Sequence, residues 1–241
     1  MTILNGTLKD HIDSIPEIDL IYIDPPFATG RNFGEYDDSL SPEETVWNVL
    51  DLLSLAWEKL KTGGNVIIHV DWRTAHLYRF FIEEHLDGFT LPNSILQNEI
   101  IWKYNSGGAS KKHLSRKHDN LLWYTKGDGY TFNVMREPYP NNYGDRPGFH
   151  PEGKMLSDVW EIPFISTSGK ERCGYPTQKP LALLERVIEI FSNENDLVLD
   201  FFAGSGTTGV AARKLQRNFI LIDVNPEATR IAEERIQNLY D

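Results

Sequence analysis

Short apolar runs alternate along this chain with longer segments whose apolar residues recur at helical spacing. The short runs are rich in β-branched residues, which predicts buried strands at 19–23, 65–70, 100–104, 120–125, 196–200 and 218–223. The helical spacing predicts helices at 42–61, 73–85, 180–191, 207–215 and 226–240. Strands that alternate with helices predict an α/β fold with a mostly parallel sheet.

The helix expected at 42–61 carries signals at both of its ends. Ser41 can serve as its N-cap, and Pro42 fits the first helical position. Gly63 and Gly64 lie just past the expected end. We therefore expect a loop at the two glycines before the strand at 65–70.

The composition excludes several classes of protein. The 241 residues are 40% hydrophobic and 24% charged, which are globular values. No run of about 18 apolar residues occurs, and the first ten residues do not resemble a signal peptide, so we expect a cytoplasmic protein with no membrane span. The single cysteine, Cys173, excludes an intrachain disulfide framework, and the seven His show no metal-ligand spacing.

The charge is unevenly distributed. The net charge of −11 argues against a nucleic-acid ligand, because phosphate binding needs a basic surface. Residues 103–118, however, contain no acidic residue and five basic ones, namely Lys103, Lys111, Lys112, Arg116 and Lys117. This segment predicts contacts to phosphate groups, with a solvated surface loop as the alternative.

A glycine-rich turn lies between the predicted strand 196–200 and the helix that follows it. Gly204, Gly206 and Gly209 form a G-x-G-x-x-G pattern, and Asp223 ends the next strand 19 residues after Gly204. Backbone N–H groups at such a helix start, together with the acid, predict a nucleoside cofactor. Only 37 residues follow Gly204, too few for a second nucleotide-binding half. We therefore expect a permuted sheet and a cofactor with one nucleoside.

The strand at 19–23 ends in Asp24-Pro25-Pro26-Phe27. A turn at the carboxyl edge of a parallel sheet faces the ligand crevice. This turn offers a carboxylate, the carbonyl of Pro25 and the ring of Phe27, and Pro26 adds no N–H donor. Two acceptors and a ring suit a planar base with an exocyclic amino group, although Pro-Pro would also end a strand without any ligand.

These motifs, in this order, resemble the amino-group DNA methyltransferases of the β group, which use S-adenosyl-L-methionine. The resemblance covers nearly the whole chain and rests on four segments, Asp24–Phe27 with 28–33, Thr177-Gln-Lys-Pro180, Asp200–Thr208 and Asp223-Val-Asn-Pro226. It implies a Rossmann-like methyltransferase sheet that is circularly permuted, with the catalytic motif N-terminal and the cofactor motif C-terminal. The implied parts are a first catalytic part (1–102), an inserted target-recognition region (103–165) and a cofactor-binding part (166–241).

The resemblance also implies roles for single residues. Asp24 and the Pro25 carbonyl would bind the target amino group within the catalytic motif, and Phe27 would stack on a flipped-out base. Cofactor-binding positions would be Thr177, Lys179, Pro180, Asp200, Phe202, Ala203, Gly204, Ser205, Gly206, Thr207, Thr208, Asp223 and Asn225. Thr177, Lys179 and Pro180 would lie near the methionine carboxylate. One departure is visible, since Gly6-Thr7 stands where such proteins often carry Gly-Asp.

The function expected from this resemblance is methylation of adenine N6 in double-stranded DNA, because Asp24 occupies a position where cytosine-N4 enzymes often have Ser. The alternatives are a cytosine-N4 DNA methyltransferase and a methyltransferase acting on RNA or a protein amide. An NAD-dependent oxidoreductase would rest on the glycine pattern alone, and an inactive nucleic-acid-binding module would leave the catalytic motif unexplained. The small recognition region and the acidic chain also favour a homodimer or a partner that contributes DNA contacts.

Overall fold

The structure is a computed structural model, and it describes residues 1–27, 40–84, 89–105, 111–139, 141, 146–166 and 169–239. The segment 28–33, which continues the predicted catalytic motif, lies outside the described residues, as do Gly107 and Gly108 of the basic segment. In the part of the chain that is described, no helix is long and apolar enough to cross a membrane.

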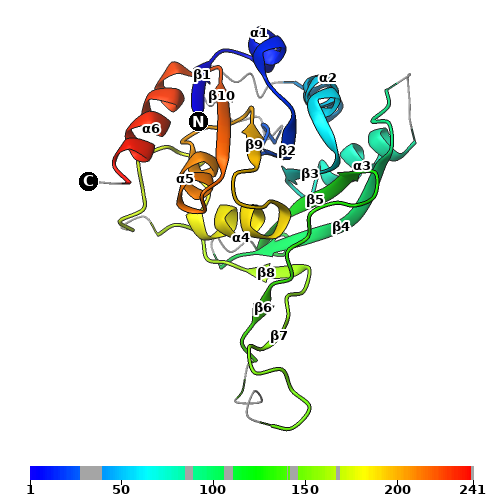
Figure 1. Ribbon diagram of the computed structural model, residues 1–241, viewed down its shortest axis with the longest axis vertical. Coiled ribbons are helices and arrows are strands. Elements are labelled where there is room, and N and C mark those ends of the chain that lie inside the picture. Colours follow the sequence, from blue (N-terminus) through cyan, green and yellow to red (C-terminus); the bar gives the residue numbers. More distant parts are fainter. Residues whose placement is uncertain are drawn as a thin grey trace.

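An eight-stranded sheet forms the centre of the molecule (Figure 1). Its strands in chain order are β1 (Thr2–Asn5), β2 (Ile18–Ile23), β3 (Leu60–Val70), β4 (Ser94–Lys103), β5 (His118–Lys126), β8 (Val159–Glu161), β9 (Leu197–Asp200) and β10 (Asn218–Asp223). Their spatial order is β1-β10-β9-β2-β3-β5-β4-β8. All neighbours pair in parallel except β5, which runs antiparallel to both β3 and β4. The mostly parallel α/β fold is thus confirmed, while the circular permutation stays a prediction.

Helices cover both faces of this sheet. They are α1 (Leu8–His11), α2 (Pro42–Lys59), α3 (Ala75–Glu83), α4 (Leu181–Phe191), α5 (Thr207–Lys214) and α6 (Pro226–Gln237), and a 3₁₀ turn spans Ile12–Ser14. Side chains alternate along each strand, so one face packs against α1–α3 and the other against α4–α6. Two apolar cores result, one on each side of the sheet.

The element boundaries differ from the predicted ones where the chain lacks a clear apolar run. The helix expected to reach residue 61 ends at Lys59, and the chain passes directly into β3, which includes Gly63 and Gly64. A Cβ at Gly63 would lie 2.9 Å from the carbonyl oxygen of Gly129, so glycine permits this close approach. β4 begins at Ser94, six residues earlier than expected, because its first half is polar and only partly buried.

Two elements at the start of the chain were not predicted. β1 is a half-exposed strand of four residues that pairs with β10 at the edge of the sheet, and α1 is a single turn. Both are too short to produce a period in the sequence.

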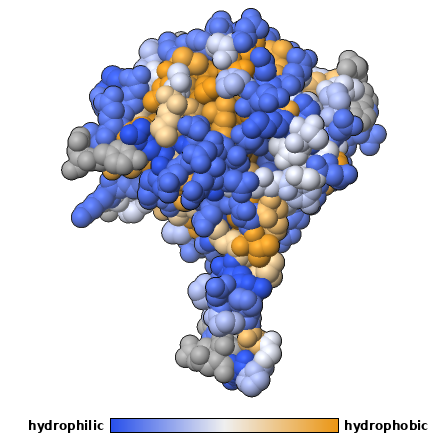
Figure 2. Space-filling view, viewed as in Figure 1, coloured by the Kyte–Doolittle hydropathy of each residue, from blue (hydrophilic) through white to orange (hydrophobic). Residues whose placement is uncertain are grey.

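A narrow arm projects from the body (Figure 1) and contains the two-stranded pair β6 (Arg136–Glu137) and β7 (Lys154–Met155). Its surface is largely hydrophilic, but an apolar area lies where it joins the body (Figure 2). Val134 just before β6, Met155 of β7 and Val159 of β8 are exposed. β5 and β8, from the region 103–165, belong to the main sheet. The assignment of that region to target recognition stays a prediction.

Candidate active site

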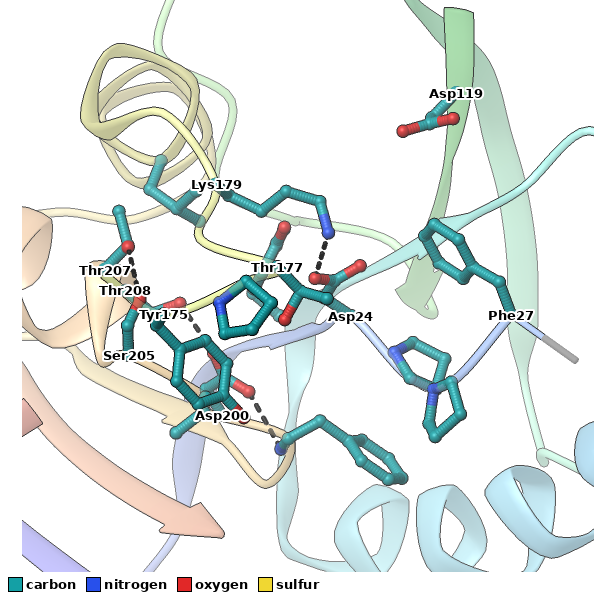
Figure 3. A pocket seen from close by; sticks show the side chains of 18 of the residues that line it. Asp24, Phe27, Asp119, Tyr175, Thr177, Lys179, Asp200, Ser205, Thr207 and Thr208 are labelled. Carbon is teal, nitrogen blue, oxygen red and sulfur yellow. Dashed lines mark hydrogen bonds and ion pairs between the residues drawn. The ribbon is translucent and has the colours of Figure 1, made fainter. Parts of the chain in front are cut away.

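Four neighbouring parallel strands end in, or directly before, an aspartate at the same edge of the sheet. Asp223 ends β10 and Asp200 ends β9, while Asp24 follows β2 and Asp71 follows β3. All four line one cavity of about 440 Å³, a volume typical of ligand sites. Because β2 and β9 are adjacent, motifs from opposite ends of the chain face each other across this cavity (Figure 3).

The glycine-rich turn forms one wall of the cavity. Gly204 and Gly206 both have left-handed backbone, with φ of 49° and 73°. A Cβ at Gly206 would lie 2.4 Å from the Cβ of Ala232 on α6, so only glycine fits between the turn and that helix. Arg235 of α6 supports the turn from behind by donating to the Ser205 carbonyl at 2.6 Å. Ser205 and Thr207 line the cavity, so the N-terminus of α5 borders it.

Asp200 links the glycine-rich turn to α5 through hydrogen bonds. Its carboxylate accepts hydrogen bonds from Phe202 N at 3.0 Å and from Thr208 Oγ1 at 2.6 Å. Burial raises the pKa of Asp200 to about 7, and the nearby charges of Asp24 and Asp223 act in the same direction. A proton on this group is thus retained close to neutral pH.

Asp223 lies at the end of β10 and is 1% exposed. It accepts hydrogen bonds from Gly204 N at 2.7 Å and from Asn225 N at 2.9 Å. Carboxylate oxygens accept more than one bond each, so this group retains capacity for the two hydroxyls of a ribose. The Asn225 side chain instead caps α6 by accepting from Glu227 N at 2.9 Å.

Not every predicted cofactor residue reaches the cavity. Thr177, Lys179, Ala203, Ser205, Thr207 and Thr208 line it together with Phe202, Gly204, Asp200 and Asp223. Pro180 is the N-cap of α4, Gly206 is the N-cap of α5, and Asn225 is the N-cap of α6. These three residues do not line the cavity, but each begins a helix close to a residue that does.

Asp24 lies at the other end of the cavity, beside Pro25, Pro26 and Phe27, which also line it. Its Oδ2 forms an ion pair with Lys179 Nζ, which also lies 5.2 Å from the centre of the Phe27 ring. Its Oδ1 is buried and has no hydrogen-bond partner within the described residues. Lys179 thus contacts the catalytic motif (Figure 3), and its place near a methionine carboxylate stays a prediction.

Several lining residues were not found from the sequence. Tyr104 is half-buried, lines the cavity and donates to Asp119 Oδ1 at 3.0 Å. Its ring lies 4.6 Å from that of Phe164, which is 37% exposed. Tyr175 lies against Gly204, and burial raises its pKa to about 12, so its hydroxyl stays protonated. Asp119 lies at the start of β5, directly before an apolar run, whereas the other acids lie at or just after the ends of their strands. Because β5 is antiparallel to β3, its start lies at the same edge of the sheet.

The five basic residues of the segment 103–118 lie in different surroundings. Only Arg116 lines the cavity, and its guanidinium lies 5.3 Å from the centre of the Trp72 ring. Lys103 forms an ion pair with Glu161. Lys111 and Lys112 are exposed, and Lys117 is half-buried. Within the described residues, no group of three or more His, Cys, Asp or Glu is placed to hold a metal ion.

The geometry is that of a nucleoside site joined to a second site with a free acceptor and a ring, and comparison with known proteins identifies it. An N6/N4 methyltransferase family model, described as DNA methylase, matches residues 18–234. The chain belongs to this DNA methylase family. The enzyme is therefore an S-adenosylmethionine-dependent DNA methyltransferase.

Individual relatives agree with the family assignment. The type II methyltransferase M.HpaI of Haemophilus parainfluenzae is 34% identical over 226 residues, which cover 93% of this chain and 69% of the relative. The DNA adenine methyltransferase YhdJ of Escherichia coli is 30% identical over 258 residues, which cover 98% of this chain and 82% of the relative. The crystal structure of the M1.HpyAVI–SAM complex superimposes with a TM-score of 0.70 at 25% identity and covers 98% of each chain.

The cavity of this DNA methylase suits the cofactor on its own geometry. The glycine turn and the start of α5 line the cavity, and Asp223 ends the next strand as a ribose acceptor would. Asp223 places a carboxylate on the wall of the cavity beside the glycine turn, which suits a cationic sulfonium. The cavity volume is also adequate for a nucleoside with an amino-acid tail.

Proposed function

We propose that the enzyme methylates the exocyclic N6 of adenine in double-stranded DNA, with the base turned out of the helix into the Asp24 end of the cavity. The observation that carries the proposal is the buried, unpartnered Oδ1 of Asp24. A buried acceptor without a partner is costly, so such an atom in a cavity indicates a hydrogen bond made to a ligand. The Pro25 carbonyl beside it provides a second acceptor for an amino group.

The residues at this end divide the work of binding and activating the base. An exocyclic amine is a weak nucleophile because its lone pair is delocalised into the ring. Hydrogen bonds from its two N–H groups to Asp24 Oδ1 and the Pro25 carbonyl localise that lone pair on nitrogen. Phe27 stacks on the base, which returns about 1–3 kcal/mol of the cost of unstacking. Lys179 orients Asp24 by holding its Oδ2.

The cofactor end is formed by the glycine turn, Tyr175 and Thr177, with Asp223 as the acceptor for the ribose hydroxyls. When bound there, S-adenosylmethionine supplies an electrophilic methyl group, so the chain needs no metal for the transfer itself. Positioning of the amine against that methyl group is the main contribution of the protein.

Two sequence features support adenine and double-stranded DNA as the target. Asp24, rather than Ser, begins the catalytic motif, and YhdJ is named as an adenine methyltransferase. Arg116 at the cavity mouth and the exposed pair Lys111 and Lys112 provide cations for phosphates. The homodimer stays a prediction.

The test transfers labelled methyl groups from S-adenosylmethionine to unmethylated genomic DNA and identifies the modified nucleoside after hydrolysis. We expect N6-methyladenine, and N4-methylcytosine would overturn the choice of base. Asp24→Ala should reduce turnover by about 10²–10³-fold. Asp51→Ala, which removes an exposed carboxylate on α2, is the matched control and should leave turnover unchanged. Calorimetry should show binding of S-adenosylmethionine and none of NAD.

A further inference from the structure

A histidine that the proposed reaction does not yet use lies directly behind Asp24. His69 is on β3 and is fully buried. Its Nδ1 lies 2.9 Å from the hydroxyl of Tyr22 and 3.9 Å from Asp24 Oδ1, the unpartnered oxygen. Its Nε2 lies 3.4 Å from Asp119 Oδ2. The imidazole thus bridges two carboxylates that both line the cavity.

The neighbours of His69 suit a ring whose proton lies on Nε2. Burial, with the negative charges of Asp24, Asp200 and Asp119, raises the pKa of Tyr22 well above its usual value, so this phenol keeps its proton. A protonated phenol can donate to Nδ1, and the imidazole proton then lies on Nε2, facing Asp119.

Asp119 lies opposite Nε2 as an anion. Burial opposes its charge, but the hydrogen bond with His69, attraction to this ring when it is protonated, the positive charge of Lys179 and the hydrogen bond from Tyr104 lower its pKa. A carboxylate in this position can orient the ring and stabilise a proton on it, while Nδ1 lies on the side of Asp24.

We propose that His69, held by Asp119, takes the proton that leaves the amino group when the base is methylated. This inference rests on the function proposed above. The amine gives its lone pair to the new N–C bond, and the electron pair of the broken C–S bond stays on sulfur. One N–H bond of the amine must then break, with its electrons returning to nitrogen. Asp24 Oδ1 accepts this proton and passes it to His69 Nδ1.

Lys179 explains why Asp24 does not keep the proton. The Lys179 side chain is 11% exposed, and its partner is the Asp24 carboxylate. A proton left on Asp24 would leave a nearly buried ammonium without a counter-charge, which is costly. Transfer to His69 restores the Asp24 carboxylate and forms an imidazolium between Asp24 and Asp119. The proton returns to solvent through Asp24 when the product leaves.

The geometry allows this transfer with small movements. The 3.9 Å between Nδ1 and Asp24 Oδ1 has to shorten to about 3 Å, and catalytic hydrogen bonds commonly tighten when substrate binds. The Tyr22 hydroxyl follows the change by rotating, because it can accept a hydrogen bond as well as donate one.

The test compares His69→Gln, Asp119→Asn and the double variant with Tyr78→Phe, which removes a buried, unpartnered phenol oxygen on α3. Single-turnover methyl transfer should fall by about 10²-fold in each single variant and no further in the double variant. Binding of S-adenosylmethionine and duplex DNA to His69→Gln should change by less than about twofold, so that the loss is in kcat and not in KM. Tyr78→Phe should match the wild type.

A second readout needs no turnover. The ¹⁵N NMR spectrum of histidine-labelled protein, with the His69 signal assigned by its absence in His69→Gln, should show a neutral ring with the proton on Nε2. A proton on Nδ1 would overturn the relay, and so would wild-type rates in His69→Gln or an equal loss in Tyr78→Phe. A wild-type enzyme that methylates no DNA would overturn the proposed function and the relay together. If His69→Gln does not fold, Asp119→Asn carries the kinetic test alone.

Discussion

The buried carboxyl of Asp200 should make the stability of the enzyme depend on pH in the opposite sense to that of an ordinary paired aspartate. Its pKa is about 7 in the folded protein and about 3.8 in the unfolded chain. Between these values the folded state holds a proton that the unfolded state has lost. The contribution of Asp200 is therefore complete below pH 3.8 and disappears as the pH rises through 7.

The size of this effect follows from the pKa difference. About three units correspond to about 4 kcal/mol, of which about 2 kcal/mol is lost between pH 5 and pH 7. Asp10 and Glu44 have lowered pKa values because of hydrogen bonds to Thr7 and Ser41, and their opposite effect is confined to more acidic conditions.

The assay is urea unfolding of the wild type and Asp200→Asn at pH 5, 6, 7 and 8 at constant ionic strength. The free energy of unfolding of the wild type should fall by about 2 kcal/mol more than that of the variant between pH 5 and 7. Asp196→Asn is the matched control, because the pKa of Asp196 is also raised by burial but the residue is only partly buried. Parallel curves for wild type and Asp200→Asn would refute the reasoning.

Three further predictions concern the glycine turn and the DNA contacts. Gly206→Ala should lower the free energy of unfolding by about 2–4 kcal/mol and abolish cofactor binding in calorimetry, because the backbone is left-handed and α6 leaves no space for a Cβ. Arg235→Ala should destabilise the protein by about 2 kcal/mol in thermal melts, because the charged hydrogen bond to the Ser205 carbonyl is lost. The double change Lys111→Ala, Lys112→Ala should flatten the salt dependence of DNA affinity by about one unit of slope per phosphate contact, and an unchanged slope would assign both lysines to a solvated surface.

The sequence by itself determined the features that depend on residues close together in the chain. The strand ending in Asp24-Pro25-Pro26-Phe27 and the turn at Gly204 and Gly206 are local patterns, so their residue types already express the backbone and the chemistry they need. Alternation of strands and helices gave the α/β class for the same reason. The short edge strand β1 and the first half of β4 were not predicted from the sequence, because these segments are only partly buried and show no clear apolar period.

Only the tertiary structure decided which side chains meet. Lys179 lies 155 residues from Asp24 along the chain, and Asp119 lies 50 residues from His69. Lys179 is a basic residue before a proline, and His69 lies within an apolar run. Neither position shows a spacing in the sequence that would identify its distant partner. The tertiary fold provides it. Antiparallel pairing of β5 with β3 brings Asp119 beside His69, and Lys179 reaches Asp24 from the segment just before α4. The cavity and its buried relay therefore follow from long-range pairing, which local residue patterns do not specify.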